Sequence, residues 1–139
     1  MENKEALDLA GAEALKIASE AVKVLFENKG IDVQMYDVRE KSPITDFYVN
    51  ASGRSTTQVA ALADDVVDEL GKRGAVALRV EGRRDNNWLL IDFGDVIVNV
   101  FDRPTRDFYA LDRHFPPESR MDTSELEAEV DAKLDLMRK

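Results

Sequence analysis

The sequence predicts an α/β domain whose mixed β-sheet has about five strands packed with helices. Two apolar runs joined by Gly94 and Asp95 are typical of a β-hairpin, because glycine suits the first central position of a two-residue type II′ turn. Ahead of the hairpin, long segments with helical periodicity alternate with short segments rich in β-branched residues. This alternation favours a layered fold of strands and helices.

The predicted elements follow in order along the chain. Residues 6–29 carry apolar side chains at helical spacing and end at Gly30, so we expect a first helix there. Ser55 to Gln58 form a capping box that begins a second helix, which ends before Gly74. Pro104 begins a short helix that holds Phe108, Tyr109 and Leu111. The strands expected outside the hairpin are residues 33–38, 47–52 and 76–80.

The hairpin register sorts its side chains onto two faces. Phe93 pairs with Val96, and the pairing runs outward until Trp88 lies opposite Phe101. One face is wholly apolar and should lie on the core: Leu89, Ile91, Phe93, Val96, Val98 and Val100. The other face mixes apolar and polar groups: Trp88, Leu90, Asp92, Ile97, Asn99 and Phe101. Such a face is either covered by groups that satisfy Asp92 and Asn99 or docks another macromolecule.

Composition restricts the classes of function. A chain of 139 residues is expected to form one globular domain without cysteines or disulfides. The formal net charge of −9 disfavours nonspecific nucleic-acid binding, since neutralising phosphates needs surplus Lys and Arg. The acidic first residues resemble neither a signal peptide nor a transit peptide, and no apolar run reaches membrane-spanning length. We therefore expect a cytoplasmic protein whose partner is a basic protein or a small molecule.

Pro116 and Pro117 divide the chain into an expected domain, residues 1–117, and an acidic C-terminal tail, residues 118–139. The tail has apolar residues at helical spacing: Leu126, Val130, Leu134 and Met137. A mostly solvated helix is favoured, because short isolated helices are weak in water, and a partner-binding helix is the alternative.

Two sequence blocks resemble the ribosomal silencing factor (Iojap) family. The first runs from Glu81-Gly82 through the hairpin to Arg106-Asp107-Phe108-Tyr109-x-Leu111, and the second from Ser42-Pro43 to Ser55. The resemblance covers about residues 6–115 and leaves out the tail. It implies a fold that resembles a nucleotidyltransferase core. Asn99 stands where most members of that family carry histidine, so any role of this site is expected to be structural or recognitive.

The resemblance also implies a function. Members of the family silence translation when nutrients are limiting, by binding the fourteenth protein of the large ribosomal subunit and blocking association with the small subunit. The expected partner-binding residues are Trp88, Leu90, Asp92, Asn99, Phe101, Phe108 and Tyr109. The hairpin face could instead form a homodimer away from the ribosome.

Enzymatic alternatives are weaker on the residues alone. Backbone amides at Gly53 to Ser55 could hold a phosphate, which leaves a nucleotide-binding or nucleotidyl-transferring enzyme as the alternative function. The adjacent runs carry no paired catalytic carboxylates, and the cap role of Ser55 explains the junction more simply. Asp92 and Asp95 fit turn chemistry better than a magnesium site, and His114 fits a surface group. Five arginines flank the hairpin and are interpreted as solvated charges rather than a basic patch: Arg79, Arg83, Arg84, Arg103 and Arg106. No catalytic residue, cofactor or metal is expected.

Overall fold

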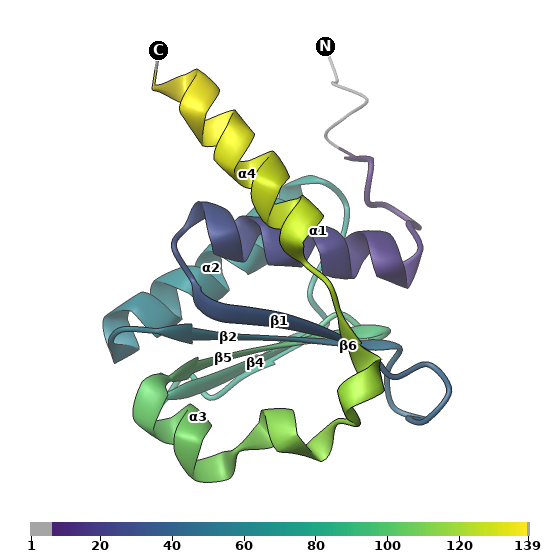
Figure 1. Cartoon of the computed structure of the whole chain (residues 1–139), viewed down its shortest axis with the longest axis vertical. Helices are drawn as coiled ribbons and strands as arrows, with labels where there is room; N and C mark the ends of the chain where they lie inside the picture. The colour runs from purple at the N-terminus through teal and green to yellow at the C-terminus, as the bar shows by residue number, and fades with distance from the viewer. Residues whose placement is uncertain (1–6, 139) are drawn as a thin grey trace.

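A computed structural model describes residues 7–138 and contains one six-stranded mixed sheet in the order β3-β4-β5-β2-β1-β6 (Figure 1). The strands are β1 (Ile31–Asp37), β2 (Phe47–Gly53), β3 (Arg79–Glu81), β4 (Trp88–Asp92), β5 (Val96–Asp102) and β6 (Arg120–Met121). β2 and β5 pair in parallel at the centre, and the other pairs are antiparallel. The predicted mixed α/β fold is confirmed, with the two-residue β6 as a sixth strand. Within residues 7–138, no helix has the length and apolar character needed to cross a membrane.

The helices form layers on the two faces of the sheet (Figure 1). They are α1 (Ala14–Glu27), α2 (Thr56–Lys72), α3 (Arg103–Tyr109) and α4 (Ser124–Met137), with short 3-10 turns η2 (Leu111–His114) and η3 (Pro117–Ser119). α1 and α2 cover one face, α3 and η2 lie on the other, and α4 crosses the outer side of α1. The apolar core therefore lies between the sheet and the α1–α2 layer.

The hairpin has the predicted register. Trp88 pairs with Phe101, and the amide N–H of Phe93 donates to the carbonyl of Val96 at 2.9 Å. Gly94 has a φ of 92°, the positive value that a type II′ turn requires of its first central residue. The predicted core face is buried except at Phe93, which stays partly exposed.

The first helix begins later than predicted. Residue 6 lies outside the described residues, and residues 7–13 form turns before the helix starts at Ala14. Gly11 has a φ of 69°, and the Leu9 N–H donates to the carbonyl of Arg73 at 2.8 Å. Leu9 is 1% exposed, so burying it against the end of α2 outweighs continuing the helix.

The third strand also begins later, at Arg79 instead of residue 76. Val76 and Leu78 are each 71% exposed. The Leu78 N–H donates a hydrogen bond to the carbonyl of Asp92 at 2.7 Å. Arg79 pairs with Asp92, the last residue of β4, so the residues before Arg79 have no strand opposite them and the ladder cannot extend.

The segment after Pro117 packs on the rest of the chain. Met121 in β6 pairs with Met35, and Val130 of α4 is 2% exposed. Lys133 lies 3.0 Å from Glu27 of α1. α4 is mostly solvated, as expected, but it is not isolated, because Val130 is buried where the helix packs on α1, which supplies the partner that a free helix lacks. The expectation that residues 1–117 form a domain of their own stays a prediction.

Candidate functional site

A chain of hydrogen-bonded side chains runs beneath α3 on the sheet face away from the core. The Trp88 indole N–H donates to Asn99 Oδ1 at 3.0 Å, and Asn99 Nδ2 donates to Asn50 Oδ1 at 3.1 Å. Asn50 and Asn99 lie opposite each other on the parallel strands β2 and β5 and are 0% and 1% exposed. Asn50 Nδ2 then donates to Asp112 Oδ1 at 3.1 Å. The polar groups of this face thus satisfy one another within the protein.

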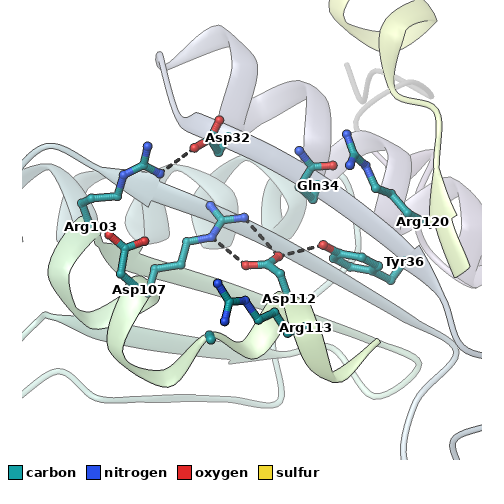
Figure 2. Close-up of a pocket in the computed structure, with 10 residues that line it drawn as sticks. Asp32, Gln34, Tyr36, Arg103, Asp107, Asp112, Arg113 and Arg120 are labelled. Atoms are coloured by element: carbon teal, nitrogen blue, oxygen red, sulfur yellow. Dashed lines mark hydrogen bonds and ion pairs between the residues drawn. The ribbon is translucent and has the colours of Figure 1, made fainter. Parts of the chain in front are cut away.

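Asp112 is the junction of this network (Figure 2). Its carboxylate accepts Nε and Nη2 of Arg106 at 2.9 and 3.1 Å, and the Tyr36 hydroxyl at 2.8 Å. Burial opposes ionisation of Asp112, but the hydrogen bonds from Arg106 and Asn50 outweigh it and hold the pKa of Asp112 below its ordinary value. Burial and the bond to Asp112 together raise the pKa of Tyr36.

Arg106 is a buried member of this network, in contrast to its expected place among the solvated arginines. It is 6% exposed, and Nη1 also donates to Ser52 Oγ at 3.0 Å, so it is not a solvated charge. Its bidentate pair with Asp112 ties η2 to α3 and the sheet. The spacing of Arg106 and Asp112 does not predict this pair, because side chains six residues apart do not adjoin on a helix and lie too far apart to touch along a strand.

An exposed cluster of aromatic rings lies over the Trp88 end of the network. The Trp88 ring lies between Phe101 and Tyr109 in tilted contacts, with centroid distances of 4.9 and 5.0 Å, and Phe108 meets Tyr109 edge-on at 4.9 Å. Phe108 is 80% exposed and Tyr109 is 51% exposed, while Phe101 is fully buried. We call Trp88, Phe108 and Tyr109 the aromatic patch. Large exposed aromatic side chains of this kind are typical of protein interfaces.

The seven predicted partner-binding residues separate into two layers. The aromatic patch reaches the surface, and Leu90 and Asp92 on β4 are partly exposed. Asn99 and Phe101 lie beneath Trp88, so they could influence a partner only through that ring. Asp92 accepts the Gly94 N–H at 2.7 Å and Arg79 Nε at 3.1 Å, which is the predicted turn chemistry plus an ion pair.

The local sequence explains how α3 presents its aromatic residues. Asp102 caps the helix by accepting the Thr105 N–H at 2.9 Å, and Pro104 lies in the first turn. Ala110 ends the helix with a φ of 49°, a left-handed conformation that is unfavourable for alanine. This turn directs the chain into η2 and brings Asp112 back against Arg106.

The Gly53 to Ser55 junction is occupied by cap and packing contacts. The Gln58 N–H donates to Ser55 Oγ at 3.1 Å, which confirms the predicted cap, and the Arg54 N–H donates to Gln58 Oε1. A Cβ on Gly53 would lie 2.9 Å from the Val59 nitrogen, so glycine is required for α2 to approach β2. His114, in η2, is exposed as expected.

Comparison with known proteins identifies the family. A family model described as ribosomal silencing factor during starvation matches residues 11–136, so the likeness extends through α4 and is not confined to residues 6–115. The ribosomal silencing factor RsfS of Haemophilus influenzae is 38% identical over 85 residues, 61% of this chain and 83% of that protein. RsfS of Bacillus subtilis is 31% identical over 99 residues, 71% of this chain and 81% of that protein.

Two crystal structures of other proteins have the same fold as this chain. A crystal structure of a Chromobacterium violaceum protein superposes with a TM-score of 0.73 at 31% identity, covering 75% of this chain and 87% of that one. A Bacillus halodurans crystal structure superposes with a TM-score of 0.64 at 30% identity, covering 78% of this chain and 95% of that one. The sequence blocks, the fold and these matches agree, and the chain belongs to the ribosomal silencing factor family.

Proposed function

We propose that this protein represses translation by binding the large ribosomal subunit through its fourteenth protein, where it blocks association with the small subunit when nutrients are limiting. Membership of the ribosomal silencing factor family supports a role on the ribosome. A mouse relative, 27% identical over 95 residues, is named mitochondrial assembly of ribosomal large subunit protein 1, which favours the large subunit as the partner. The proposal places the protein in the cytoplasm with the ribosomes that it binds.

The observation that carries the proposal is the aromatic patch. Phe108 and Tyr109 are exposed in the free protein, yet Trp88 is held by its tilted contact with Phe101 and by its hydrogen bond to Asn99. Preorganised aromatic side chains lose little conformational entropy on binding and are frequent interface hot spots. The patch therefore has the properties of a docking anchor.

Charge favours a basic ribosomal protein as the direct partner. The chain has a formal net charge of −9, and complementary charge on a partner raises the rate of association. Blocking subunit association then needs only that the bound domain occupy the face where the small subunit docks. No chemical step is required, and we propose that the protein is not an enzyme.

Co-sedimentation with separated ribosomal subunits tests this function. The purified protein should pellet with large subunits and not with small ones, and it should reduce the yield of joined ribosomes when both subunits are mixed. Equal recovery with both subunits, or undiminished joining at saturating protein, would contradict the proposal. Sedimentation equilibrium without ribosomes would detect a homodimer that uses the same patch.

A nucleotidyl-transferring enzyme that uses the Gly53 to Ser55 junction is the alternative function. The contacts at the junction argue against it, because the amides of Arg54 and Gln58 already donate to side-chain oxygens. Incubation with nucleoside triphosphates and Mg²⁺ should therefore give no pyrophosphate above a heat-unfolded control. Release of several pyrophosphate molecules per protein molecule would contradict the repressor function and support the enzyme.

A further inference from the structure

The network beneath α3 has a hydrogen-bond donor at one end and an acceptor at the other. The Trp88 indole nitrogen can only donate, whereas the ionised carboxylate of Asp112 can only accept. Although burial opposes ionisation, the hydrogen bonds from Arg106 and Asn50 hold the pKa of Asp112 below its ordinary value. Two buried amides, Asn50 and Asn99, join the two ends. We call the side chains of Trp88, Asn99, Asn50 and Asp112 the relay.

The two ends of the relay allow one orientation of the amides. Because Asp112 Oδ1 accepts, Asn50 turns Nδ2 toward it at 3.1 Å and turns Oδ1 toward Asn99. Asn99 then turns Nδ2 toward Asn50 at 3.1 Å, which leaves its Oδ1 for the Trp88 indole N–H at 3.0 Å. Turning over either amide, or both, would set two donors against each other at one contact and two acceptors at another. Buried polar groups left without partners are costly, so the acceptor at Asp112 decides which atom of Asn99 meets Trp88.

We propose that Asp112 is a positioning residue that orients the indole of Trp88 in the aromatic patch through the two amides of the relay. The same carboxylate pairs with Arg106 of α3, the helix that carries the other two residues of the patch. One side chain on η2 therefore fixes patch residues that come from two separate elements, β4 and α3. The consequence for ribosome binding rests on the function proposed above, whereas the orientation of the indole does not.

The indole N–H resonance in the NMR spectrum of isotope-labelled protein reports on the end of the relay, since Trp88 is the only tryptophan. In the wild type this proton should exchange with water at least about tenfold more slowly than that of a free indole. Asp112→Ala removes the terminal acceptor, so exchange should accelerate about tenfold and the resonance should move toward that of an exposed indole. Asn50→Ala breaks the next link, should move the resonance in the same direction, and provides the test if Asp112→Ala does not fold.

Two control variants separate the relay from general stability. Tyr36→Phe removes a different donor to Asp112 Oδ1, at 2.8 Å, and leaves the relay intact, so the indole resonance should stay in place. Val130→Ala lowers stability from α4, which packs on α1 over the opposite face of the sheet, and should also leave the resonance unchanged. A resonance that stays at its wild-type position in Asp112→Ala and Asn50→Ala would overturn the proposal. Equal movement in Val130→Ala would overturn it as well.

Co-sedimentation of Asp112→Ala with large ribosomal subunits is a separate measurement. If the aromatic patch is the docking anchor, this variant should bind about tenfold more weakly than the wild type. A moved indole resonance with undiminished binding would support the relay and contradict the patch as the anchor. An unmoved resonance would contradict the relay whatever the binding, so failure of the relay and failure of the docking proposal are distinguishable.

Discussion

Trp88 and Asn99 lie diagonally across the β4–β5 hairpin and are joined by a hydrogen bond of 3.0 Å from the indole nitrogen to the amide oxygen. This bond connects a ring at the surface to an amide that is 1% exposed. The position of the aromatic patch therefore depends on a buried network that continues through Asn50 to Asp112.

A double-mutant cycle measures this connection. Trp88→Phe should lower the free energy of unfolding by about 1 kcal/mol, because Asn99 Oδ1 loses its donor. Asn99→Ala should lower it by about 2–3 kcal/mol, because Trp88 and Asn50 both lose a partner. In the double variant the losses should fall short of their sum by about 0.5–1 kcal/mol in urea unfolding followed by circular dichroism. Strict additivity would mean that the bond contributes nothing.

Asp112→Asn should make stability less sensitive to acid. Because the pKa of folded Asp112 lies below its ordinary value of 3.8, its contribution is full above about pH 4 and is lost as the pH falls below that value. At pH 7 the variant should be less stable by about 2–3 kcal/mol, since it leaves Arg106 buried without its carboxylate. The gap between wild type and variant should narrow below pH 4. The exposed Asp107→Asn is the control, and a gap independent of pH would refute the assignment.

Phe108→Ala and Tyr109→Ala should separate binding from stability. Each residue is at least half exposed, so the free energy of unfolding should change by no more than about 0.5 kcal/mol. Loss of a hot-spot side chain should cost about 2 kcal/mol of binding to large subunits, roughly thirtyfold. Leu136→Ala on α4, 71% exposed in the wild type, is the matched control and should bind normally in the same sedimentation assay. If all three variants bind alike, the patch is not the anchor.

Ala110→Gly should stabilise the protein. The φ of 49° at Ala110 is unfavourable for a residue with a Cβ and is readily adopted by glycine. We expect the free energy of unfolding to rise by about 0.5–1 kcal/mol in thermal or urea unfolding. Ala128→Gly, at an exposed position inside α4, should do the opposite and cost about 1 kcal/mol. Destabilisation by both changes would show that Ala110 makes contacts that outweigh its strain.

Val130→Ala tests the packing of α4 on α1. Val130 is 2% exposed, so removing its methyl groups should cost about 1–2 kcal/mol, whereas Leu136→Ala should cost less than about 0.5 kcal/mol. Truncation after Pro117 should cost more, because it also removes the β6 pairing with β1. An unchanged urea midpoint after truncation would instead establish residues 1–117 as an independent domain.

Local features of this protein are predictable from its sequence. The Gly94 turn fixes which residues of β4 and β5 pair, and the two-residue period of a strand then assigns every hairpin side chain to a face. The Ser55 cap is likewise decided within four residues. The composition of each face, including the aromatic residues of the candidate site, follows from these short-range rules.

Convergence of distant segments depends on the tertiary structure. Asn50 and Asp112 are 62 positions apart, and they meet only because β2 pairs in parallel with β5 and Ala110 turns the chain back under α3. Leu9 is held out of the first helix by the end of α2, and Val130 of α4 is buried where that helix packs on α1. Parallel strand pairing and helix packing depend on the free energy gained when segments far apart in the chain bury surface against each other. A local sequence pattern carries no information about that free energy. For that reason the sequence predicts the aromatic residues of the site, while the Arg106–Asp112 pair and the relay from Asp112 to Trp88 emerge only in the folded chain.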